Sequence, residues 1–328
     1  SGVFKDTVRE FIAFAPKKAM LKHYDRLNDV LNQRGAYQFG YALTDEEAIS
    51  QGIGIREGKA VGRGSYDALK PTTIYQENEV ERVIDGVKLK LVSAVGETDD
   101  QIFIWLEEDQ VICTGDNYYG CWPNLYAIRG TQYRDIAAWV DTLGVILSYD
   151  AKVLLPGHTR PIIGREQIQD QIGTFRDAIE YVLLETLDCM NKGMTMGETV
   201  EQVKLPERYL DKEYLGEFYG TVEWSVKSIY CGYVGWFDGN AAGLMPVSHK
   251  AYQAVLRELI GAEKLTDTIK GYLAQEQYQI ALQLLELADE REMTEFISLK
   301  KEALLGRARQ MTSANARHYF IASAKALG

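Results

Sequence analysis

Short apolar runs separated by polar turns dominate the first half of the chain. Residues 87–92 alternate apolar and polar positions, which predicts a half-buried strand, and the Asp85-Gly86 pair before them is typical of a hairpin turn. Further strands are predicted at residues 102–106, 111–113 and 152–155. Residues 5–33, with a break near Pro16, and residues 131–147 follow a helical period. Strands interleaved with helices predict a layered α/β domain.

The pattern changes in the second half, where helical spacing takes over. Apolar residues recur at helical positions from Ile168 to Leu187, and residues 263–309 resemble paired antiparallel helices. We therefore expect an α/β domain over residues 1–164, followed by an all-α helical domain over residues 165–328. A long helical domain with a broad apolar face is suited to dimerisation.

Composition narrows the range of partners. Of the 328 residues, 46% are hydrophobic and 25% are charged, as in an ordinary soluble globular protein. The net charge of −11 argues against nucleic acid or an anionic membrane surface as a partner. No apolar run approaches the roughly 18 residues that span a bilayer. The compartment stays unassigned, and we expect the cytoplasm if no signal peptide precedes Ser1.

The candidate chemistry lies where predicted strands meet loops. Glu97 and Asp116 each follow a strand-like run, and His158 follows the strand at 152–155 within a loop bounded by prolines. A carboxylate can bridge two cations, while a neutral imidazole binds one. The three residues therefore predict part of a two-metal site and a metal-dependent hydrolase. Three ligands are only about half of such a site.

Six short motifs stand in order along the chain: GETDDQ at 96–101, GDN at 115–117, PNLYAIRG at 123–130, HTRP at 158–161, YGT at 219–221 and GWFDGN at 235–240. Together they resemble the alkylsulfatase branch of the metallo-β-lactamase superfamily. The resemblance implies that the α/β domain is part of an αββα sandwich, without its N-terminal portion, and that a helical dimerisation domain follows. It also implies a homodimer that cleaves sulfate esters.

The resemblance assigns roles to individual residues. Two zinc ions are expected in the complete protein, with Glu97 as a ligand of the first, His158 as a ligand of the second, and Asp116 as the bridge between them. Asn124 and Arg129 would contact the anionic head of a small ester substrate. Asp116 and Arg129 would be the catalytic residues of a hydrolysis by metal-activated water. A guanidinium suits a sulfate because its fork matches two oxygens.

Two departures from the family pattern affect these expectations. The family's His-x-His-x-Asp-His motif has no counterpart among the four histidines, which are His23, His158, His249 and His318. Because residues 1–4 resemble the stretch that follows this motif in relatives, we expect it on a longer natural chain. Trp224 stands where characterised alkylsulfatases often carry a histidine. An indole has no acceptor, which puts a long-chain alkyl sulfate in doubt as the substrate.

Other interpretations stay open beside the hydrolase. A catalytically inactive relative would act as a self-associating binding or scaffold protein. A nucleotide-binding protein would use the glycine-rich residues 52–64, although these lack the strand-then-helix context of a nucleotide fingerprint. Arg129 could also pair with Asp135 and order its own loop, and phosphate or other anionic esters suit a metal pair with an arginine as well as sulfates do.

Overall fold

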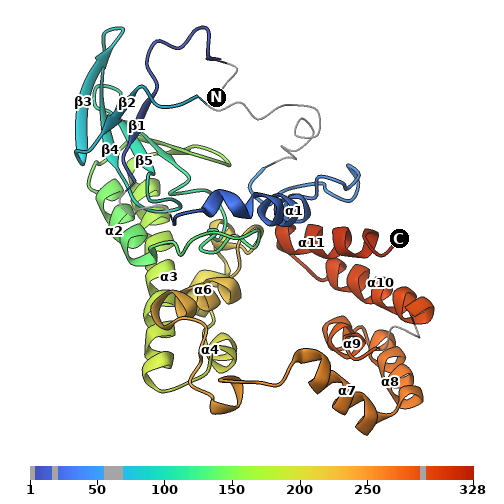
Figure 1. Cartoon of the computed structure of the whole chain (residues 1–328). Coiled ribbons are helices and arrows are strands. Elements are labelled where there is room, and N and C mark those ends of the chain that lie inside the picture. The colour runs from blue at the N-terminus through green and yellow to red at the C-terminus, as the bar shows by residue number, and fades with distance from the viewer. Residues whose placement is uncertain (1–3, 17–20, 55–68, 289–292) are drawn as a thin grey trace.

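The computed structural model describes residues 4–16, 21–54, 69–288 and 293–328. A twisted sheet lies at one end of the molecule, and a series of helices extends from it (Figure 1). The last helix, α11 (Ala314–Lys325), returns to pack beside α1 (Asn28–Gln38), so the end of the chain contacts its beginning.

The main sheet has six strands in the order in which they occur along the chain. They are β3 (Glu79–Ile84), β4 (Val87–Ser93), β5 (Ile102–Leu106), β6 (Val111–Gly115), β7 (Val153–Pro156) and β8 (Ile162–Ile163). Neighbouring strands are antiparallel except for β6 and β7, which run parallel. The four strands expected from the sequence are confirmed, whereas β3 and the two-residue β8 were not expected.

The hairpin between β3 and β4 follows from its turn residues. Asp85 and Gly86 have φ values of 49° and 82°, and Ile84 pairs with Val87 across the turn. Two consecutive positive φ values are the requirement of the turn that matches strand twist, and Asp-Gly meets it at low cost. The predicted hairpin turn is confirmed.

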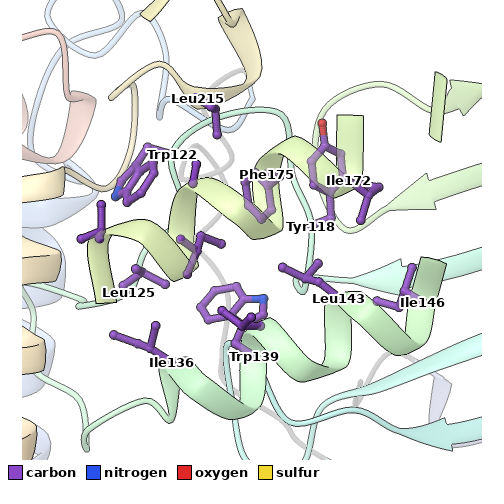
Figure 2. Packing of buried hydrophobic residues seen from close by; sticks show 14 of the residues in the cluster. Tyr118, Trp122, Leu125, Ile136, Trp139, Leu143, Ile146, Ile172, Phe175 and Leu215 are labelled. Carbon is purple, nitrogen blue, oxygen red and sulfur yellow. The ribbon is translucent and has the colours of Figure 1, made fainter. Parts of the chain in front are cut away.

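Two helices cover one face of this sheet, α2 (Ile136–Leu147) and α3 (Arg165–Asn191). The helix α2 begins at Ile136 because the Asp135 side chain accepts a hydrogen bond from the Ala138 amide at 3.0 Å. In Figure 2 the side chains of Trp139 and Leu143 on α2 point toward Phe175 on α3. All three side chains are buried in one cluster with the inner faces of β5, β6 and β7.

Further helices follow α3 along the chain. They are α4 (Met196–Gln202), α5 (Glu207–Leu210), α6 (Val222–Val234), α7 (His249–Ile260), α8 (Ala262–Ala274), α9 (Tyr278–Leu285), α10 (Met293–Arg309) and α11, with short 3₁₀ turns at Tyr24–Leu27, Glu213–Leu215 and Ala241–Gly243. The expected fold class, α/β followed by all-α, is confirmed.

The two largest hydrophobic cores among the described residues divide the molecule differently from the change in secondary structure. The first core holds the sheet together with α2, α3 and α6 and extends to Ile229, while the second lies among α8 to α11 from Leu265 to Ala324. The Trp122 indole donates to Ser225 Oγ at 3.0 Å, which ties the loop after β6 to α6. The expected domain boundary at residues 164/165 stays a prediction. It marks a change in secondary structure, whereas the packing of the first core continues past it to Ile229.

The helical prediction for residues 5–33 is wrong over most of its length. Ile12–Phe14 forms β1, which pairs parallel with β2 (Thr73–Tyr75), and regular helix begins only at Asn28. Strand pairing with a segment about sixty residues away outweighs a weak local preference. Most of the glycine-rich segment 52–64 lies outside the described residues. Within the described part, every helix is either too short or too polar to cross a bilayer.

Truncating the core of α2 tests this packing. Leu143→Ala removes a buried side chain between α2 and α3, and should lower the free energy of unfolding by about 2–5 kcal/mol. Val145→Ala on the exposed side of the same helix should change it by less than about 1 kcal/mol. Urea denaturation followed by circular dichroism measures both. Equal losses in the free energy of unfolding for the two substitutions would contradict the assignment of Leu143 to the buried face of α2.

Candidate active site

The parallel pairing of β6 and β7 brings Asp116 and His158 together. Because the two strands run in the same direction, their carboxyl ends meet at one edge of the sheet, and Asp116 and His158 follow those ends. His158 Nε2 lies 3.6 Å from Asp116 Oδ1. Two ligands of one tetrahedral zinc ion, each about 2.0–2.1 Å from it, are roughly 3.3 Å apart. The pair therefore fits one shared cation.

Two glycines allow this close approach. Gly115 has a φ of +55°, and the pairing of β6 with β7 shifts register at this residue, which turns Asp116 out of the strand. The Gly157 amide donates to Gly115 O at 2.8 Å, and a Cβ on Gly157 would overlap Asp116 Oδ1. Any larger residue at 157 would push the Asp116 carboxylate away from His158.

Glu97 lies beside this pair and is held by Arg134. The Glu97 Oε1 atom accepts a hydrogen bond from Arg134 Nη1 at 2.9 Å, and the two side chains are only 13% and 5% exposed. Burial raises the pKa of the Glu97 carboxyl above its ordinary value, while the charge of Arg134 opposes that rise. Asp116 raises this pKa further and His158 lowers it, so all three candidate ligands interact electrostatically.

The donor set fits part of a metal centre. Within residues 4–16, 21–54, 69–288 and 293–328, no three His, Cys, Asp or Glu side chains converge closely enough to hold an ion. Asp116 and His158 form a pair, and Glu97 is close enough for both to act on its carboxyl group electrostatically. The side chains of Asp116 and His158 are 40% and 23% exposed, so both remain accessible to a cation and to further ligands.

Asn124 lies on a buried loop beside the pair. Its backbone amide donates to Tyr119 Oη at 2.7 Å, its carbonyl accepts from Arg134, and its side-chain Oδ1 is buried without a hydrogen-bond partner among the described residues. The Tyr119 ring also stands edge-on to the His158 ring, with centroids 6.0 Å apart. Tyr119 and Arg134 therefore link Asn124 to the candidate ligands.

Arg129 lies further from the pair. Its amide donates to Gln38 Oε1 at 2.9 Å, and its guanidinium donates to Gly130 O at 3.4 Å. Asp135, which the sequence offered as an ion-pair partner of Arg129, caps α2. The charge of Arg129 acts on the buried Tyr219 phenol, whose ring stands edge-on to that of Tyr119 at 6.0 Å.

Sequence reasoning missed the roles of Tyr119, Tyr219 and Arg134. Burial raises the pKa of both tyrosines above the ordinary value, so they stay neutral phenols that can donate hydrogen bonds. Arg134 holds Glu97 and the Asn124 loop at once. The short motif that contains Tyr219 pointed toward the site, but nothing in the sequence indicated which carboxylate Arg134 would pair with.

Comparisons with known proteins agree with this architecture. Residues 195–328 match the family model described as alkyl sulfatase dimerisation. A linear primary-alkylsulfatase of Pseudomonas sp. (strain ATCC 19151) is 36% identical over 220 residues, which are 66% of this chain and 41% of that protein. The alkyl/aryl-sulfatase BDS1 of Saccharomyces cerevisiae is 30% identical over 237 residues, or 71% of this chain and 36% of that protein.

A solved structure shows the same fold. The stereoselective inverting sec-alkylsulfatase Pisa1 from Pseudomonas sp. superposes with a TM-score of 0.87 over 97% of this chain and 51% of that chain, at 23% identity. The fold is thus an α/β part followed by helices, of which residues 195–328 match the alkyl sulfatase dimerisation model. The resemblance to the alkylsulfatase branch is confirmed. The chain spans about two fifths of the length of the curated relatives.

Removing Arg134 tests the electrostatics of the site. Arg134→Met leaves a buried carboxylate unpaired and should cost about 3–5 kcal/mol of stability at pH 7. A carboxyl whose folded pKa is raised loses stability as the pH rises from its ordinary value of 4.5 through the raised value. Arg134→Met raises the folded pKa further, so its cost should be smaller near pH 4.5 than at pH 7.

The double variant provides the control for this prediction. Glu97→Gln removes the charge, so Arg134→Met should cost less in a Glu97→Gln background than in the wild-type chain. Urea denaturation at several pH values measures these differences. A cost of Arg134→Met that depends on neither pH nor Glu97 would contradict the ion pair.

Proposed function

We propose that this chain is a zinc-dependent hydrolase of sulfate esters. The observation that carries the proposal is the Asp116–His158 pair at the carboxyl ends of β6 and β7, with the buried Glu97–Arg134 ion pair beside it. The most similar curated relatives reported above are named as alkylsulfatases, which supports sulfate esters as the substrate class. A small anionic ester also suits a site that would be cationic when metal is bound.

Three residues of this chain would hold the metal. Asp116 and His158 would bind one ion, Glu97 would bind a second, and the Asp116 carboxylate would bridge the two. Bound zinc lowers the pKa of water so that hydroxide is available near neutral pH, and it offsets negative charge on a departing sulfate. Other ligands would come from residues beyond these three.

Binding and orientation of the ester fall to the groups around the metal edge. Arg129 would place its guanidinium fork against two sulfate oxygens. The buried Oδ1 atom of Asn124 has no hydrogen-bond partner among the residues that the structure describes, and as an acceptor it would take a donor such as a bound water molecule. The neutral Tyr119 and Tyr219 phenols would line the site, while Arg134 would keep Glu97 ionised and oriented rather than contact the ester.

The assembly proposed for the active protein is a homodimer. The match of residues 195–328 to a dimerisation domain supports a second copy of this chain as the partner. The second hydrophobic core, from Leu265 to Ala324, lies within this matched part.

Metal content and sulfate release test the hydrolase proposal. Asp116→Ala and His158→Ala should each lower zinc affinity more than about tenfold, because each removes one of the paired ligands. The matched control Asp150→Ala changes an exposed aspartate that pairs with Arg165, and should leave zinc binding unchanged. Elemental mass spectrometry and zinc titration measure this, followed by assays of sulfate release. If a longer natural chain that supplies the other ligands also binds no zinc, a self-associating scaffold protein is favoured instead.

The role of Arg129 is tested separately. Arg129→Met removes a charged hydrogen bond to the ester, which should raise KM for a sulfate ester about tenfold or more while zinc content stays unchanged. Arg176→Met on α3 removes an arginine outside the site motifs that pairs with the adjacent Asp177, and serves as the control. An unchanged KM in the Arg129 variant would show that this arginine orders its loop only.

A further inference from the structure

One face of α1, the helix beside α11 in Figure 1, packs against the loop that contains Arg129. Gln38 Oε1 accepts the Arg129 amide at 2.9 Å, and a Cβ on Gly35 would lie 4.0 Å from Arg129 Cδ. A Cβ on Gly130 would lie 3.9 Å from Arg34 Nη1. Because residues 34 and 38 are one turn apart on the helix, α1 brings both side chains to the same loop.

The two arginines at this loop have no carboxylate partner within the parts of the chain that the structure describes. The Arg129 guanidinium donates to Gly130 O at 3.4 Å, and Arg34 forms no ion pair there. The chain has 47 acidic residues against 36 basic ones, so a shortage of carboxylates is not the reason. Two like charges that lie near one residue repel each other unless an anion offsets them. The pair is therefore suited to the anion of a ligand.

The Gln38 amide adds a buried donor to the two guanidinium groups. Gln38 is 0% exposed, and its Nε2 atom has no hydrogen-bond partner among the described residues. The orientation of this amide is fixed because its Oε1 atom accepts the Arg129 amide, and a flipped group would set two donors against each other. Buried donors are almost always paired, and a carboxylate oxygen is an acceptor that would pair this one.

Aromatic rings separate this group of donors from the metal edge. The charge of Arg129 acts on the Tyr219 phenol, and the Tyr219 ring stands edge-on to the Tyr119 ring, with centroids 6.0 Å apart. The Tyr119 ring stands in the same way to the His158 ring, again at 6.0 Å. A ligand that reaches from His158 to Arg34 therefore passes two aromatic rings, so its two charged ends need a spacer between them.

We propose that Arg34 and the Gln38 amide bind a carboxylate of the substrate, next to the sulfate head that Arg129 contacts. The fork of a guanidinium matches the two oxygens of a carboxylate, and the Gln38 amide can donate to one of them. The metal ions and Arg129 offset the charge of the sulfate head, which leaves Arg34 for the second anion. This inference rests on the proposed function and narrows its substrate class to sulfate esters that carry a carboxylate.

Two esters that differ in one group test the carboxylate. In 4-sulfooxybutanoate a carboxylate replaces the terminal methyl group of butyl sulfate, which adds a charged hydrogen bond and should lower the Kd about tenfold. Arg34→Met should abolish most of this difference, whereas the control Arg176→Met on α3 should retain it. Isothermal titration calorimetry measures each Kd. Equal Kd values for the two esters on the wild-type chain would overturn the proposal.

Gln38→Glu is a second variant that keeps the size of the side chain. Its carboxylate can still accept the Arg129 amide, but it places a negative charge beside Arg34. The Kd of 4-sulfooxybutanoate should therefore rise about tenfold or more, to at least that of butyl sulfate. Circular dichroism checks that each variant is folded. A folded Gln38→Glu chain that binds 4-sulfooxybutanoate as tightly as the wild-type chain would contradict the proposal.

The binding measurement also separates this inference from the proposed function. If neither ester binds to the wild-type chain, the carboxylate site is overturned, while zinc content and sulfate release still decide the hydrolase. If sulfate is released from both esters at the same Kd, the hydrolase stands and the carboxylate site does not.

Discussion

The parallel pairing of β6 with β7 is the constraint on which the candidate site depends. It is the one parallel pair in the six-stranded sheet, and parallel neighbours need a crossover, which α2 supplies between them. The buried face of α2 against α3 holds this crossover on the sheet, so the core shown in Figure 2 also fixes the distance between Asp116 and His158. Antiparallel pairing would have put these two side chains at opposite edges.

The helical part supports the same site rather than standing apart from it. Ser313 Oγ, at the start of α11, donates to Tyr219 O at 2.7 Å, and Asn315 Nδ2 lies 3.4 Å from the same oxygen. His318 Nδ1 lies 3.2 Å from Gln38 O, and Gln38 Oε1 accepts the Arg129 amide. Through these contacts α11 supports the backbone at Tyr219. By way of Gln38 it also supports the loop that contains Arg129. Dimerisation and catalysis, as proposed, would therefore share one structural support.

Much of this arrangement could be predicted from the sequence, because short-range rules control it. Period-two alternation indicated β4, the Asp-Gly pair indicated the hairpin, and strand ends indicated Glu97, Asp116 and His158. Long-range strand pairing could not be predicted from local patterns. The strand β1 pairs with β2 about sixty residues away, although its local pattern favoured a helix. Local patterns also do not specify that the missing Cβ of Gly157 leaves space for the Asp116 carboxylate, or that Arg134 forms its ion pair with Glu97. These contacts depend on atoms that only the folded chain brings together.

The most direct test of the central claim is to locate zinc in crystals of the protein grown with the metal, by anomalous scattering at the zinc absorption edge. We expect a peak between Asp116 Oδ1 and His158 Nε2, about 2.0–2.2 Å from each. A zinc peak at exposed His23 or His249, with none between these two atoms, would contradict it.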